Sequence, residues 1–122
     1  MVKLVFALRR RQDISDEEFH RYWLDEHGPL ARGLLEKLGA EAYVQSHSLG
    51  ADLNGALAES RGTAEPYDGV AEVSWQSLDA LVAAAGSEEG ERINETLRQD
   101  EARFIDFERS SIFITEEHRL IG

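Results

Sequence analysis

The fold of this protein is decided by the stretch "DEEFHRYWLDEHGPLARG", residues 16–33. Phe19, Trp23 and His27 follow one another at intervals of four residues, so a helix through them places all three side chains on one face. Ser15 stands directly before the stretch, in the position of a helix cap, and the acidic residues after it suit the positive end of a helix dipole. The pattern predicts an amphipathic helix that turns two aromatic rings and an imidazole toward the protein interior.

The pair Gly28-Pro29 follows the histidine directly and predicts an interruption of this helix. Proline has no backbone donor, and its ring clashes with the preceding turn. A second helical piece is expected over residues 30–39, with Gly39 as its C-terminal cap. The sequence therefore places His27 at a break in the helix, at the rim of a cavity.

The rest of the chain alternates strand patterns with helix patterns. Strands are predicted at residues 2–9, 40–49, 68–75 and 108–117, helices at 78–86 and 87–105, and a loop at 50–67. The order β-α-β-β-α-β, with each helix in two pieces, predicts a ferredoxin-like α+β fold, in which helices cover one face of a four-stranded antiparallel sheet. Because the strands are apolar on both sides, the bare face needs a cover, and the simplest cover is the same face of a second copy. We therefore expect a homodimer.

The composition excludes several classes of function. The chain has the length of one domain, residues 1–122, and its net charge of −11 repels nucleic acids and anionic membranes, so we expect neither as a partner. It has no cysteine, which excludes disulfides and thiol chemistry. The apolar N-terminal run precedes its basic cluster, in the reverse order of a signal peptide, and no segment is long enough to span a bilayer, so a cytoplasmic location is expected. No histidine pair has metal-ligand spacing and no nucleotide-binding motif is present, so we expect no metal and no cofactor.

His27 is the first candidate for chemistry, because an imidazole in a cavity can accept and return protons near neutral pH. The alternative is a core histidine with one satisfied hydrogen bond. Tyr43, Gln45 and His47 share one face of the second predicted strand. The phenol of Tyr43 and the imidazole of His47 could bind a carbonyl or phenolic ligand, and the alternative for them is a half-exposed strand edge.

Two carboxyl groups lie on one face of the third predicted strand. Asp68 and Glu72 are four residues apart, so roughly 13 Å separates their Cα atoms, which is too far for a shared proton. If it is buried, Glu72 could act as a general acid or accept a hydrogen bond from His27 and orient it; the alternative is a salt bridge to Arg9. Asp68 is a candidate ligand contact, with a turn residue as its alternative.

The aromatic residues of the first helix supply candidate pocket walls. Phe19 and Trp23 would line an apolar pocket, and Tyr22 beside them would be a further ligand contact, with core packing as the alternative. Asp100 interrupts the apolar line of the last helix. For Asp100 we favour packing or a salt bridge between helices over a chemical role.

Four stretches resemble the EthD-like family of dimeric α/β-barrel proteins: "VKLVFALRRR", "SDEEFHRYWLDEHGPLA", "YDGVAEVSW" and "DEARFIDFERS". The resemblance implies a homodimer whose two sheets form a barrel, with a pocket in each protomer between sheet and helices. It also implies that His27 lies at that pocket. It does not imply one reaction, and many dimeric-barrel enzymes use neither metal nor flavin, in line with the cofactor-free expectation.

These patterns lead to two classes of function. The first is a cofactor-independent enzyme that moves protons on a small aromatic, polyketide-like or lactone metabolite, as an isomerase, cyclase or decarboxylase. His27 would move the proton, and Tyr43 would stabilise the enolate or phenolate oxygen. The second is a non-catalytic dimer that binds a metabolite or supports an oxygenase system. A cofactor-free monooxygenase is a further alternative.

Overall fold

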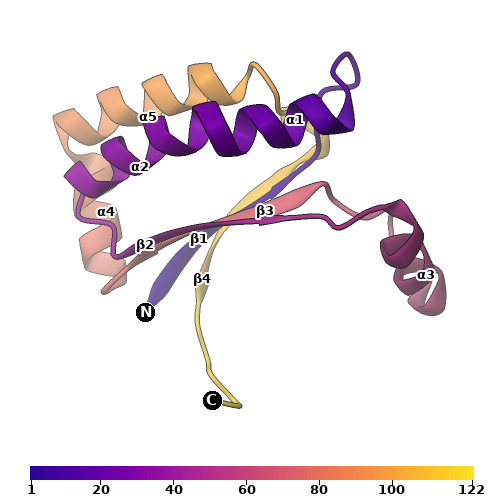
Figure 1. Cartoon of the computed structure of the whole chain (residues 1–122). Coiled ribbons are helices and arrows are strands. Elements are labelled where there is room, and N and C mark those ends of the chain that lie inside the picture. Colours follow the sequence, from indigo (N-terminus) through magenta and orange to yellow (C-terminus); the bar gives the residue numbers. More distant parts are fainter.

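The computed structural model describes residues 1–122 and has one antiparallel sheet (Figure 1). Its strands are β1 (Val2–Leu8), β2 (Ala42–His47), β3 (Gly69–Trp75) and β4 (Ser111–Glu116), in the spatial order β2-β3-β1-β4. The main helices lie together on one face of this sheet, as Figure 1 shows. The predicted ferredoxin-like α+β fold is confirmed.

The first helix does not break at the Gly-Pro pair, so this prediction was wrong. Helix α1 (Asp16–Tyr22) continues through a π-helical turn, η1 (Trp23–His27), directly into α2 (Gly28–Lys37). Gly28 has helical backbone angles, and its N–H donates to the carbonyl of Trp23, five residues earlier. Proline is tolerated here because it stands in the first turn of α2, where its missing donor costs little.

The second predicted helix is split into two pieces, as expected. Helix α4 (Leu78–Gly86) ends where Ser87 caps α5 (Glu88–Glu101), and the Ser87 side chain accepts from the N–H of Gly90. Helix α5 ends at Glu101, earlier than the sequence pattern indicated. A turn and the short 3-10 helix η2 (Phe107–Arg109) lead from there to β4.

The segment 50–67 contains a helix, where the sequence predicted a loop. Helix α3 (Ala51–Arg61) ends at Gly62, whose left-handed φ of 64° forms the C-terminal cap. Figure 1 shows α3 beyond the end of the sheet, apart from the other helices. None of its residues is buried, so the helix needs no apolar face, and the sequence carried no period that could reveal it.

The core fills the space between the sheet and α1, α2, α4 and α5. Its two clusters comprise Leu8, Phe19, Trp23, Phe104 and Ile105 at one end, and Ala31, Leu35, Val73, Trp75 and Leu81 at the other. The opposite face of the sheet has no covering layer: Val44 and Phe113, which lie on that face, are 49% and 50% exposed. No helix is both long and apolar enough to cross a membrane.

Candidate active site

A narrow cavity of about 100 Å³ lies between the sheet and the helices. Most of its wall is aliphatic or aromatic, and β1, β3, α2 and α5 each contribute two or three residues. Four polar side chains interrupt this wall: His27, Tyr43, Asn94 and Glu101. An apolar cavity with a few converging polar groups is the usual form of a small-molecule site.

His27 is held in one orientation by Asp100 of α5. Its Nδ1 lies 2.7 Å from Asp100 Oδ2, and the ring is only 5% exposed. Because a carboxylate oxygen accepts, Nδ1 carries the proton in the neutral ring. The Nε2 atom then carries the lone pair and is the nitrogen left for a ligand in the cavity. Burial lowers the pKa of His27 and the hydrogen bond to Asp100 opposes this shift, so the ring is neutral at pH 7 and can act as a base.

Asp100 is in turn held in place by Tyr22 of α1. The Tyr22 hydroxyl donates to Asp100 Oδ1 at 2.5 Å, and Arg103 Nε lies 3.7 Å from the same oxygen. Burial, and then the bond to Asp100, raise the pKa of Tyr22 to about 12, so this phenol keeps its proton. Tyr22 therefore supports Asp100 and packs against the core, which was the alternative to a ligand contact in the sequence analysis; it does not line the cavity. Asp100 forms the contact between helices that the sequence favoured.

Glu101 is a cavity residue that the sequence analysis missed. Its carboxyl is half-buried and has no hydrogen-bond or ion-pair partner in the chain. Burial and then the neighbouring Asp100 raise the pKa of Glu101 to about 7, against the opposing effect of Arg98. One signal could have revealed it: Glu101 lies four residues after Leu97, on the buried line of α5.

Tyr43 lines the cavity from β2, and its hydroxyl is held by Gln45. Gln45 Nε2 donates to the Tyr43 oxygen at 2.7 Å and to the carbonyl of Trp23 at 2.9 Å. The same carbonyl accepts the N–H of Gly28 in the π-helical turn. Burial raises the pKa of Tyr43, so the phenol keeps a proton that it can donate to a ligand.

His47 lies outside the cavity, on the other side of Trp23. Its ring packs on the Trp23 ring with centroids 4.1 Å apart, and its Nε2–H donates to Gln45 Oε1 at 2.8 Å. Its Nδ1 lies 2.7 Å from Nδ1 of His20. The structure therefore does not bring His47 to the site, although burial, and then the charge of His20, lower its pKa as well.

The two aromatic residues predicted as pocket walls, Phe19 and Trp23, lie in different places in the structure. Trp23 lines the cavity, whereas Phe19 is fully buried in the core behind it, where it packs against Phe104 with ring centroids 5.7 Å apart. Trp23 thus lies where the sequence placed a ligand contact, and Phe19 supports it from behind.

The carboxyl groups of Glu72, on β3, and Asp68, just before β3, do not contact His27. Glu72 points to the uncovered face of the sheet, where Lys3 Nζ lies 3.3 Å from its Oε2. The salt bridge predicted as its alternative therefore exists, but with Lys3 in place of Arg9. Asp68 Oδ2 accepts the backbone N–H of Arg10 at 2.8 Å, as a loop residue would.

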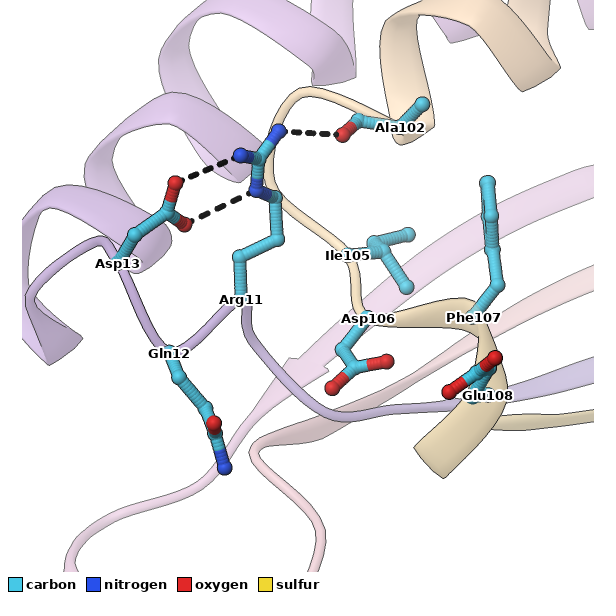
Figure 2. Close-up of a pocket in the computed structure, with 8 residues that line it drawn as sticks. All are labelled: Arg11, Gln12, Asp13, Ala102, Ile105, Asp106, Phe107 and Glu108. Carbon is cyan, nitrogen blue, oxygen red and sulfur yellow. Dashed lines mark hydrogen bonds and ion pairs between the residues drawn. The ribbon is translucent and has the colours of Figure 1, made fainter.

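A second hollow of about 510 Å³ lies at the turn after β1 and is shown in Figure 2. Arg11 dominates it and is already engaged: it pairs with Asp13 at 2.6 and 2.9 Å and donates to the carbonyl of Ala102 at 3.0 Å. Asp106 and Glu108 make the rest of this hollow acidic. No histidine lines this hollow, so the narrow cavity at His27 is the better candidate for proton transfer.

Comparison with known proteins identifies the family of this chain. Residues 11–108 match the EthD domain, a span that includes all four polar cavity residues. The chain belongs to the EthD family. It is also similar to the protein named dehydratase ustZ of Ustilaginoidea virens, at 26% identity over 108 residues, which cover 86% of this chain and 75% of that protein.

Solved structures support the fold of this EthD family member. An EthD family protein from Bacillus halodurans has a TM-score of 0.65 at 19% identity, covering 97% of this chain and 99% of its own. A protein from Bacteroides fragilis, described as dimeric and ferredoxin-like, has a TM-score of 0.61 at 13% identity, with 95% of each chain covered. At these identities the likeness shows the fold alone.

Proposed function

We propose that this EthD family member is a cofactor-independent enzyme that moves protons on a small carbonyl compound, with His27 as the base. One observation supports this most strongly: a buried, neutral imidazole is oriented by Asp100 so that its basic nitrogen is free in an apolar cavity. A protein that only binds a metabolite, or only assists an oxygenase, has no need of such an arrangement. The name of the relative ustZ, a dehydratase, also favours an enzyme of small-molecule metabolism.

Tyr43 has the second role in this proposal. When His27 removes a proton next to a carbonyl, negative charge develops on the carbonyl oxygen. A phenol that keeps its proton and faces the cavity can donate to that oxygen. Isomerisation, cyclisation and decarboxylation all pass through such an enolate, so the pair His27 and Tyr43 serves each of them.

The cavity also limits the substrate. Its volume of about 100 Å³ is below the ~300–1,000 Å³ of typical ligand pockets, so it accepts one compact, mostly apolar portion of a molecule. A ring of an aromatic or polyketide-like compound, or a lactone, matches this description. A larger substrate would extend past Ile112 of β4, a cavity residue that is 55% exposed.

The proposed working form is a homodimer. Val44 and Phe113 lie half-exposed on the uncovered sheet face, and a structural neighbour is described as dimeric. We expect Phe113→Lys to convert the dimer to a monomer in analytical ultracentrifugation, because it replaces an apolar side chain of the uncovered face with a charge. An unchanged sedimentation coefficient would contradict a sheet-to-sheet dimer. A cytoplasmic location stays a prediction.

Solvent deuterium exchange tests the proposed base. Methyl isobutyl ketone in D₂O reports proton removal next to a carbonyl, and mass spectrometry follows the label. The wild-type chain should accelerate exchange, His27→Gln should lose this acceleration by about 100-fold, and His118→Gln should keep it, since His118 is an exposed residue near the C-terminus. Equal rates for wild type and His27→Gln would refute the proposal.

A further inference from the structure

Two adjacent carboxyl groups at the end of α5 have opposite surroundings. Asp100 accepts from Tyr22 and His27 and lies near Arg103. Glu101, the next residue, has no such partner and turns into the cavity that also contains His27. The proton-transfer function proposed above uses Asp100 but assigns no role to Glu101.

The groups around Glu101 favour a protonated carboxyl. On α5 the charge of Asp100 repels a second negative charge, and Arg98 is engaged with Glu95, 2.6 Å from its Oε1. From the other elements the cavity presents only groups that are neutral at pH 7, Tyr43 of β2 and His27 of the π-helical turn. These surroundings raise the pKa of Glu101 to about 7, so the side chain retains a proton that it can give away.

We propose that Glu101 is the general acid of this site and that the substrate class is a β-hydroxy carbonyl compound, which loses water. The inference rests on the proposed proton-transfer function. A single base suffices for exchange or isomerisation at one carbon. Elimination of water also calls for a proton at the leaving oxygen, and His27 and Glu101 share one cavity, so one group can take the proton from carbon while the other protonates the hydroxyl.

The chemical steps balance as follows. His27 Nε2 takes the proton from the carbon next to the carbonyl, and the electron pair moves to the carbonyl oxygen, to which Tyr43 donates. The enolate then re-forms the carbonyl and a new carbon–carbon double bond, while the bond from the β carbon to its hydroxyl breaks. The hydroxyl takes the proton of Glu101 and leaves as water. The imidazolium of His27 afterwards returns its proton to the Glu101 carboxylate, directly or through solvent.

Diacetone alcohol is a compact probe for this step, because its dehydration gives mesityl oxide, which is measured by ultraviolet absorbance. The wild-type chain should form mesityl oxide, and Glu101→Gln should form it about 100-fold more slowly. Methyl isobutyl ketone has no hydroxyl to lose. The rate of deuterium exchange into this ketone should therefore fall by no more than about tenfold in the same variant. Glu89→Gln is the matched control, because Glu89 is an exposed residue of the same helix.

The two proposals fail in different ways. If the wild-type chain exchanges deuterium but Glu101→Gln dehydrates diacetone alcohol at the wild-type rate, the acid role of Glu101 is refuted and the base role of His27 stands. If Glu101→Gln lowers both reactions equally while the variant stays folded by circular dichroism, Glu101 is not a specific proton donor. If the wild-type chain exchanges no deuterium, the proposed function falls and this inference falls with it.

Carbon-detected NMR of the Glu101 carboxyl gives a readout that needs no substrate. The signal that disappears in Glu101→Gln should titrate near pH 7 in the wild-type chain. Titration at the ordinary value for glutamate, about pH 4, would overturn the role of proton donor at neutral pH.

Discussion

Two histidine sites lie on either side of Trp23, and they differ in what each ring has for a partner. His27 donates to a carboxylate and faces a cavity, whereas His47 bonds to an amide and to the ring of His20. Burial lowers the pKa of both rings. The comparison shows that burial alone does not make a base: the carboxylate fixes which nitrogen is basic, and the cavity gives that nitrogen something to act on.

The largest effect is expected from changing the partner of His27. In Asp100→Asn the amide group can donate to Nδ1 and favour the opposite tautomer, which moves the lone pair away from the cavity. We expect the rate of deuterium exchange to fall about 100-fold. Asp25→Asn, at an exposed position, serves as the control. A rate within twofold of wild type for Asp100→Asn would show that the carboxylate does not orient the ring.

The next effect tests the wall between the two histidine sites. A Cβ atom at Gly69 would lie 2.5 Å from the Trp23 ring and 2.7 Å from the Ser46 carbonyl oxygen, so Gly69→Ala must relieve both contacts by shifting these groups or its own backbone. We expect the free energy of unfolding to fall by about 2 kcal/mol in urea denaturation.

Gly55→Ala is the matched control for this wall, because nothing lies within 4 Å of a Cβ atom at that position in α3. A helix interior favours alanine over glycine, so the control should gain up to about 1 kcal/mol. Equal stability of Gly69→Ala and wild type would mean that Trp23 is not tightly packed against β3.

A smaller effect concerns pH and Glu101. The pKa of Glu101 is raised from 4.5 to about 7 in the folded chain, so between these values the folded state holds a proton that the unfolded state has lost. The wild-type chain therefore loses stability as pH rises through this window, and Glu101→Gln does not. The full pKa shift corresponds to about 2.5 kcal/mol between pH 5 and pH 8. Solvent screens the half-buried carboxyl, so the variant should gain about 1 kcal/mol relative to wild type, measured by denaturation at each pH. A constant difference would contradict the raised pKa.

The smallest effect is expected from His47→Gln. Loss of the imidazole removes a hydrogen bond to Gln45, worth about 1 kcal/mol of stability. His47 contacts no reacting atom in the proposed mechanism. The rate of deuterium exchange should change less than about threefold, since that bond acts on Tyr43 only through Gln45. A loss as large as that of Asp100→Asn would place His47 in the catalytic machinery and erase the contrast between the two sites.

The sequence predicted the architecture because local patterns determine it. The spacing of Phe19, Trp23 and His27 identified the buried face of the first helix, and strand order followed from element order. On β3 the alternation also contained an unused signal: Val73 and Trp75 fill the core, so Glu72, on the other parity, has to face away from His27.

Other features of the site depend on tertiary contacts that local patterns do not encode. Asp100 meets His27 across 73 residues of chain, so nothing near either residue announces the pair. The π-helical turn was missed because proline usually ends a helix, and here one wider turn accommodates it. These contacts between α1, the π-helical turn and α5 are what turn a predicted buried histidine into an oriented one.

Nitrogen-detected NMR of the His27 ring at pH 7 tests the central claim most directly. The account predicts a neutral ring with its proton on Nδ1 and a lone pair on Nε2, and a pKa below the ordinary value of 6.5. The signals that vanish in His27→Gln provide the assignment. A ring protonated on both nitrogens at pH 7, or one with its proton on Nε2, would contradict the account.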